Sequence, residues 1–162
     1  MKHLLILTIS LFFSSLMAEM LIIPQEESLS LPLPLPYERK EVSNAELIDF
    51  ISQSKPGNQS IIIFGANWCP DCRILEGTLK LPTVRKFMNQ NFSIMHIDLG
   101  KYDLNMSLME IIGIPSQEGI PRVIIFNEDG KPLNLDSSDR WRAARDDKQQ
   151  DIFNYFQKFV LH

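Results

Sequence analysis

The sequence predicts an α/β protein with a central mixed sheet flanked by helices and closed by a C-terminal amphipathic helix. Three observations lead to this prediction. Two runs of β-branched and aromatic residues, at 60–65 and 122–126, are typical of strands buried on both faces. Segments with apolar residues at helical spacing alternate with the predicted strands. The last such segment begins at about Asp147 and has one apolar face.

The composition of the chain excludes several classes of protein. Its 162 residues suffice for one compact domain with a short appendage. Hydrophobic residues at 44% and charged residues at 22% argue against a disordered or fibrous protein. The net charge of −4 disfavours a nucleic-acid scaffold or a polybasic membrane binder. Two cysteines cannot form a disulfide-rich scaffold, nor a four-thiolate zinc site on their own.

Residues 1–18 have the pattern of a secretory signal peptide. A short positive start precedes an apolar run that is too short to span a bilayer, and Ala18 offers a cleavage site. We therefore expect an exported protein, with the bacterial periplasm as the first choice of compartment. The alternative is an uncleaved membrane anchor, because the apolar residues 20–23 could extend the run.

Residues 19–40 are predicted to form a Leu/Pro-rich extension before the domain, which we place at 41–162. Residues 24–36 contain four of the ten prolines, and three of these alternate with leucine. This composition favours extended, polyproline-like backbone, so we interpret the stretch as a plain linker. A partner-binding proline motif is the alternative.

The domain is predicted to begin with a helix. Ser43 and Glu46 have the spacing of a capping box, and Val42 can pack on Leu47 as a hydrophobic staple. Pro56-Gly57 is expected to end this helix.

The first predicted strand, 60–65, is followed by a helix that starts at Pro70, where proline's missing amide proton costs nothing. Leu81-Pro82 should break this helix, and a second strand is expected at 92–98. Residues 104–112 carry apolar side chains at helical spacing. After the strand at 122–126, an Asn-Glu-Asp-Gly turn is expected to lead into a short strand around 132–135.

Both cysteines lie in Trp68-Cys69-Pro70-Asp71-Cys72, between a predicted strand and a predicted helix. Residues i and i+3 of a first helical turn lie on one face at about 5–6 Å, which suits a disulfide. The helix amides and dipole should lower the pKa of Cys69 and favour its thiolate. We therefore expect Cys69 to attack a partner disulfide and Cys72 to resolve the mixed disulfide.

Three other interpretations of the cysteine pair stay open. A structural disulfide would close a very short loop and constrain the unfolded chain little. A metal site would need further ligands, and the histidines are His3, His96 and His162, of which His96 fits a satisfied imidazole on a strand. Chance pairing of two inert cysteines is the third. The strand–CxxC–helix context favours redox chemistry over all three.

Two motifs resemble the thioredoxin family. Residues 64–73 match its active-site segment, F-x-A-x-W-C-x-x-C-[KR], and Gly119-Ile120-Pro121 before a buried strand resembles its cis-proline loop. The order of elements over 41–162 is similar too.

The resemblance implies a thioredoxin fold and a thiol–disulfide oxidoreductase, with Cys69 as nucleophile and Cys72 as resolving cysteine. It also implies that Pro121 faces the pair after a cis bond, and that Trp68 and the backbone of Ile120 contact the substrate. Ile114-Pro115 is the rival position for the cis bond, but no strand follows it. No metal or organic cofactor is implied, and the expected partners are thiol- or disulfide-bearing proteins and a redox partner.

The sequence departs from the family pattern near the cysteines. Ile63 stands where thioredoxins carry a buried acid, and Glu76 or Asp71 are the candidate substitutes, although each is interpreted as a solvated residue. Gly77 replaces a helix proline and is expected to loosen the helix. Within the Pro70-Asp71 dipeptide, the charge of Asp71 should raise the pKa of the neighbouring thiol.

The predicted function is therefore exchange of disulfides with exported proteins through Cys69 and Cys72. One alternative is a non-catalytic thioredoxin-fold binding module with a structural disulfide, and another is a thiol-based metal chaperone. The basic-aromatic segment 140–145 could dock an acidic partner, but we interpret it as a solvated segment with one packed tryptophan.

Overall fold

The computed structural model describes residues 19–53 and 57–160; the predicted signal peptide lies outside these ranges. The sheet has three strands in the order β2-β1-β3, and β1 runs parallel to β2 and antiparallel to β3. The strands are β1 (Gln59–Gly65), β2 (Phe92–Asp98) and β3 (Arg122–Phe126). The α-helices are α1 (Asn44–Ser52), α2 (Pro70–Leu79), α3 (Pro82–Asn91), α4 (Ser107–Ile111) and α5 (Gln149–Lys158). Two 3₁₀ helices, η1 (Leu135–Ser137) and η2 (Arg140–Asp146), lie between β3 and α5.

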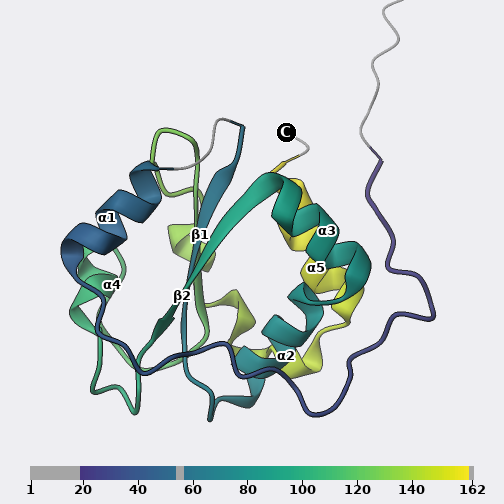
Figure 1. Ribbon diagram of the computed structural model, residues 1–162, viewed down its shortest axis with the longest axis horizontal. Coiled ribbons are helices and arrows are strands. Elements are labelled where there is room, and N and C mark those ends of the chain that lie inside the picture. Colours follow the sequence, from purple (N-terminus) through teal and green to yellow (C-terminus); the bar gives the residue numbers. More distant parts are fainter. Residues whose placement is uncertain (1–18, 54–56, 161–162) are drawn as a thin grey trace, which may run out of the picture.

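Helices cover both faces of the sheet. Helices α1 and α4 lie on one side, and α2, α3 and α5 on the other (Figure 1). The central strand β1 is therefore buried along nearly all its length, and every residue of β3 is buried. This explains the continuous apolar runs in both strands. None of the helices in the described ranges is long and apolar enough to cross a membrane.

The helix starts predicted after Ser43, at Pro70 and at the Leu81-Pro82 break are confirmed, as are the three predicted strands at 60–65, 92–98 and 122–126. Ser43 Oγ accepts a hydrogen bond from the Glu46 amide at 3.1 Å, and Glu46 accepts one from the Ser43 amide at 2.8 Å. The amide of Ser43 is the largest cause that lowers the pKa of Glu46 to about 2. The capping box therefore supports α1 above the ordinary pKa of glutamate and loses this effect as the pH falls toward 2.

Several predicted boundaries are wrong. Helix α1 ends at Ser52 and so does not reach Pro56-Gly57. Its apolar face also stops at Ser52, directly after Ile51. The helix expected over 104–112 is reduced to the single short helix α4. Its start is delayed because Asn105 has a φ of 55°, which a right-handed helix does not allow.

The strand predicted at 132–135 does not form. The turn at 127–130 is present, but only Pro132 bridges to Phe126. The backbone ladder reaches no further than the Leu133 amide, which donates to the Ile125 carbonyl at 2.8 Å. The side chain of Asn134 takes the place of a strand instead, since it accepts a hydrogen bond from the Ile125 amide and donates one to the Val123 carbonyl.

Residues 19–36 form a strap without helix or strand that is bound to the domain, so the interpretation of residues 24–36 as a plain linker is wrong. The strap runs past α5 and α3, then past α2 toward α1 (Figure 1). Near its start, the Leu21 amide donates to Gln157 of α5 at 2.6 Å. Glu27 then accepts hydrogen bonds from the amide and hydroxyl of Thr83, and so caps the start of α3. Finally, Arg73 of α2 donates to the Leu33 carbonyl at 2.9 Å.

Gly77 gives the strap room to pack on α2, and the predicted loosening of the helix is wrong. Helix α2 is uninterrupted from Pro70 to Leu79. A Cβ atom on Gly77 would lie 3.1 Å from a methyl carbon of Leu29 and 3.2 Å from one of Leu33, both in the strap. The glycine therefore leaves room for a close approach of the strap, which a Cβ atom would crowd.

Candidate active site

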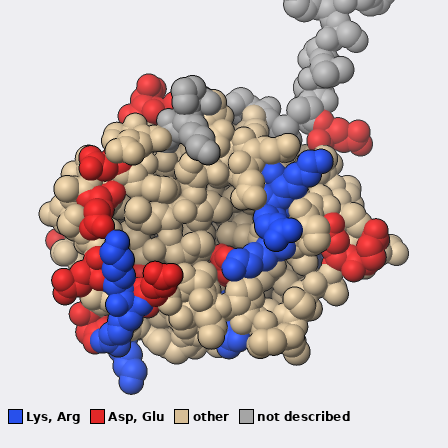
Figure 2. All heavy atoms as spheres, viewed as in Figure 1, with Lys and Arg blue, Asp and Glu red and all other residues tan. Residues whose placement is uncertain are grey.

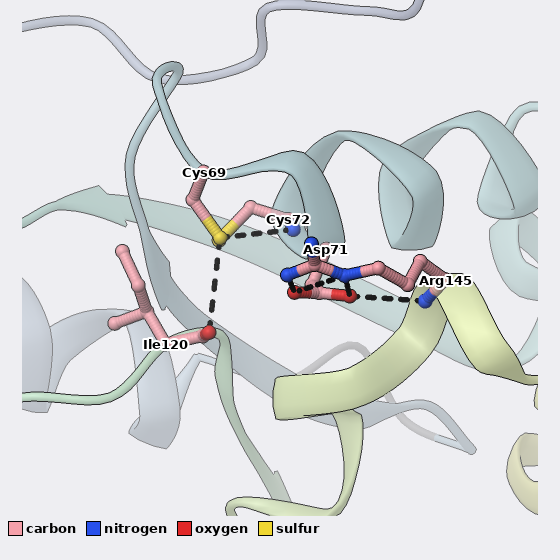
Figure 3. Close-up of polar contacts among 5 residues, drawn as sticks. All are labelled: Cys69, Asp71, Cys72, Ile120 and Arg145. Atoms are coloured by element: carbon pink, nitrogen blue, oxygen red, sulfur yellow. Dashed lines mark hydrogen bonds and ion pairs between the residues drawn. The ribbon is translucent and has the colours of Figure 1, made fainter.

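The junction of β1 and α2 places both cysteines beneath the first turn of α2. Cys69 is the N-cap residue, and its Sγ accepts a hydrogen bond from the Cys72 amide at 3.2 Å. Both side chains are buried and both are free thiols. The structure therefore brings the predicted nucleophile and the predicted resolving cysteine together, with the Cys72 amide directed at the sulfur of Cys69 (Figure 3).

The pKa values of the two thiols are shifted in opposite directions. The pKa of Cys69 is lowered, first by a hydrogen bond from the Cys72 thiol and also by the amides of Cys72 and Asp71, while burial opposes the shift. The pKa of Cys72 is raised far above its ordinary value, first by burial and then by its bond to Cys69. Cys69 is consequently the group that forms a thiolate, while Cys72 holds its proton.

This difference predicts the pH dependence of alkylation. In the reduced wild-type protein, iodoacetamide should modify Cys69 with a midpoint below the ordinary cysteine pKa of about 8.5, and should leave Cys72 unmodified over the same range. Cys72→Ala should move the midpoint of Cys69 upward, because it removes the largest stabilising contact of the thiolate. Mass spectrometry across a pH series measures both effects. Identical midpoints in the two proteins would contradict the assignment.

The loop before β3 lies against Cys69. The Ile120–Pro121 peptide bond is cis, whereas Ile114–Pro115 is not. The Cys69 thiol donates to the Ile120 carbonyl oxygen at 3.7 Å, as Figure 3 shows. Both Ile120 and Pro121 are buried. Pairing of a substrate with the backbone of Ile120 stays a prediction, and in this reduced state the Ile120 carbonyl is turned to the thiol.

Trp68 is the apolar side chain that the site presents to solvent. It is 53% exposed beside the buried Cys69. Its indole N–H donates to the Gly100 carbonyl at 2.6 Å, and its ring meets the edge of Tyr102 with centroids 5.7 Å apart. The ring is thus held in one orientation, which suits its predicted role as a substrate contact.

Asp71 is buried, so its interpretation as a solvated residue is wrong. It is 2% exposed, and its carboxylate accepts hydrogen bonds from the backbone amide and Nε of Arg145 at 3.0 and 2.9 Å, with a further ion pair to Nη2. Arg145 belongs to η2, which also buries Trp141. The packed tryptophan expected in 140–145 is confirmed, but the segment also covers the start of α2 (Figure 3).

Comparison with known proteins places this site in a family. A family model described as thioredoxin matches residues 37–135. The chain belongs to the thioredoxin family. The crystal structure of a disulphide isomerase from Xylella fastidiosa Temecula1 is 31% identical, covers 79% of this chain and 98% of its own, and superimposes with a TM-score of 0.70. A mutant thioredoxin from Halobacterium salinarum NRC-1 is 18% identical over 74% of this chain and 88% of its own, with a TM-score of 0.48. A comparison with curated proteins found no match.

Ile63 makes this an atypical thioredoxin-family site, because it stands where thioredoxins carry a buried acid. Glu76 does not replace that acid. Ile63 is buried in β1 and stands in register with His96 of β2. Glu76 is also buried, against expectation. One of its oxygens bonds His96 Nε2 at 2.7 Å, and the other pairs with Lys80 Nζ at 3.3 Å. The satisfied, half-buried imidazole predicted at His96 is confirmed.

Tyr37 is the residue near the thiols that sequence reasoning missed. It is 4% exposed and follows the strap directly. The side chain of Asn67 holds its backbone on both sides, because it accepts from the Tyr37 amide at 3.1 Å and donates to the Tyr37 carbonyl at 2.7 Å. The phenol lies over Gly65, where a Cβ atom would collide with its hydroxyl. Gly65 was the available signal, since a glycine in a strand often marks such an approach.

The charge of Asp71 acts on Cys69 in the predicted direction, because it raises the pKa of that thiol against the stronger lowering contacts. We expect Asp71→Asn to lower the pKa of Cys69 further and to make the protein a stronger oxidant, by on the order of 10–30 mV. Redox titration against glutathione measures the potential. Asp129→Asn, at an exposed turn, is the matched control for loss of one negative charge. An unchanged or more negative potential in Asp71→Asn would show that this charge does not tune the site.

Proposed function

We propose that this protein exchanges disulfides with exported proteins through Cys69 and Cys72. Membership of the thioredoxin family and the paired thiols support a general thiol–disulfide oxidoreductase role. The observation that carries the proposal is the asymmetry of the pair: an acidic thiol at a helix N-terminus beside a buried thiol that keeps its proton. Export rests on the pattern of residues 1–18.

The reaction has two exchange steps. In the first, the Cys69 thiolate attacks one sulfur of a substrate disulfide; a Cys69–substrate bond forms, the substrate disulfide breaks, and one substrate thiolate leaves. In the second, Cys72 attacks Cys69 Sγ; the Cys69–Cys72 disulfide forms, and the second substrate sulfur leaves with the electron pair and takes up the proton. The protein dithiol is oxidised and the substrate disulfide is reduced. The same steps in reverse oxidise a substrate dithiol.

The surface around the pair offers an apolar ring and a backbone segment to a protein substrate. Trp68 and the loop at Ile120 flank the thiols. Elsewhere, acidic and basic side chains lie close together, with wide uncharged areas between them on the face that Figure 2 shows. We expect selection of substrates by apolar and backbone contacts at the rim of the site.

Trapping of mixed disulfides tests the proposal. The full chain with Cys72→Ala, expressed in a bacterium, should accumulate covalent adducts with proteins of the exported fraction, since Cys69 can attack but nothing resolves the product. Reducing agent should release the adducts, and Cys69→Ser/Cys72→Ala should form none. Adducts confined to cytoplasmic proteins would overturn the export proposal. If no adducts form, but the double variant retains exported proteins non-covalently, the result would favour a binding module.

A further inference from the structure

The hydroxyl of Tyr37 is a buried polar group without a partner. Within the described residues it makes no hydrogen bond, although the residue is 4% exposed. Buried hydroxyls are nearly always bonded, because desolvation without a compensating bond is unfavourable. An unpartnered hydroxyl at a reactive centre is therefore a candidate for a bond that forms in another state of the reaction.

The group that this hydroxyl faces is the resolving cysteine. A Cβ atom built on Gly65 would meet the Tyr37 hydroxyl and would lie 3.0 Å from Cys72 Sγ, so oxygen and sulfur border the same small space. The edge of the phenol ring also contacts His96, with ring centroids 5.5 Å apart. The titratable groups around the phenol are therefore Cys72 and Cys69, with Glu76 of α2 and His96 of β2.

Cys72 needs a donor at this place. To attack Cys69 it must become a thiolate in a buried, largely apolar site, which disfavours the charged form. The neighbouring carboxylates could accept the proton of Cys72, but each already has other partners. Glu76 bonds His96 and Lys80, and Asp71 bonds Arg145. Ile63 offers no polar atom. The Tyr37 hydroxyl is the remaining side-chain donor at the sulfur within the described part of the chain.

We propose that Tyr37 is a catalytic residue of the resolving step, whose hydroxyl donates a hydrogen bond to Cys72 Sγ as that thiol becomes a thiolate. This inference rests on the proposed disulfide exchange. As Cys72 attacks, its S–H bond breaks, the Cys69–Cys72 bond forms and the bond from Cys69 to the substrate sulfur breaks. The substrate sulfur leaves with the electron pair and takes the proton that Cys72 gives up. Tyr37 keeps its own proton throughout.

The acidity of Tyr37 agrees with a donor role. Its pKa is raised well above the ordinary value, first by burial and then by negative charge at Cys72, Glu76 and Cys69. A phenol with a raised pKa stays protonated at every pH at which the protein works, so it can donate to a thiolate but cannot act as the base. Asn67 fixes the backbone of Tyr37 by two hydrogen bonds, and so holds the residue at the place where its hydroxyl borders Cys72 Sγ.

A small aromatic disulfide, dithiobis(nitrobenzoate), tests this step in the full-length reduced protein. Attack by Cys69 releases one thionitrobenzoate, and attack by Cys72 on the mixed disulfide releases a second, so stopped-flow absorbance follows the two steps as separate phases. Tyr37→Phe should leave the first phase unchanged and slow the second by roughly 3- to 10-fold, since loss of a donor raises the thiolate pKa while nucleophilicity partly compensates. The variant should reach the wild-type second-phase rate only at a higher pH.

Tyr155→Phe is the matched control, because its hydroxyl bonds Asn134 and Ser137 away from the thiols. It should change neither phase. A second phase in Tyr37→Phe with wild-type rate and pH profile overturns the role of Tyr37. A second phase that is slower by one factor at every pH, with a lower Tm, would show a packing role and also overturn it. Wild-type protein that releases no second thionitrobenzoate would instead refute the proposed exchange itself.

Discussion

Cys69→Ser is expected to abolish the catalysed reduction of insulin by dithiothreitol, so that only the uncatalysed rate is left. Cys69 is the thiol whose pKa is lowered and the one turned to the cis-proline loop. A serine hydroxyl has the same shape but does not ionise near neutral pH, so no mixed disulfide can form. The turbidity of precipitating insulin chains gives the rate.

Cys72→Ser provides the comparison for this experiment. It should turn over far more slowly than the wild-type protein, because the mixed disulfide with Cys69 is then resolved by dithiothreitol from solution and no longer by Cys72. The circular dichroism and Tm of both variants should match those of the reduced wild-type protein. Undiminished catalysis by Cys69→Ser would remove Cys69 from the role of nucleophile.

Gly65→Ala is expected to lower the free energy of unfolding by about 1–3 kcal/mol. Its Cβ atom would collide with the Tyr37 hydroxyl and press on Cys72 Sγ. All three residues are buried, and the two hydrogen bonds from Asn67 to the Tyr37 backbone limit how far that residue can move away. Urea denaturation of the reduced protein measures the loss.

A double-mutant cycle identifies the cause of this destabilisation. Tyr37→Ala removes the ring with which the new methyl group collides, so Gly65→Ala should be much less destabilising in that background. An equal loss in both backgrounds would mean that the collision lies elsewhere along β1. The same pair of variants also shows whether disturbance of the phenol slows the resolving step.

The sequence predicted those parts of the fold that depend on neighbours along the chain. The capping box at Ser43, the helix start at Pro70 and the break at Pro82 are local signals, and each is confirmed. The strand predicted at 132–135 failed because one side chain, that of Asn134, took over the hydrogen bonds of a strand. Local periodicity does not register such a replacement.

The errors at the site have a common physical origin. Asp71 and Glu76 were interpreted as solvated because acids on a helix usually are. Their burial depends on Arg145 and His96, which come from other parts of the chain. Tyr37 was missed for the same reason, since it reaches the thiols only because the strap and Asn67 hold it there. The cysteine pair was found because a single helical turn contains its geometry.

The attachment of the strap to α5 bears on the order in which the molecule is completed. The amides of Leu21 and Ile23 donate to Gln157 and Gln150 of α5. The first residues of the described chain therefore cannot form their native contacts until α5 has been synthesised. Tyr37 lies at the end of that strap. An emerging chain can therefore form the turn with both cysteines well before the phenol is secured beside them. During that interval the cysteines belong to a site that is chemically different from the finished one.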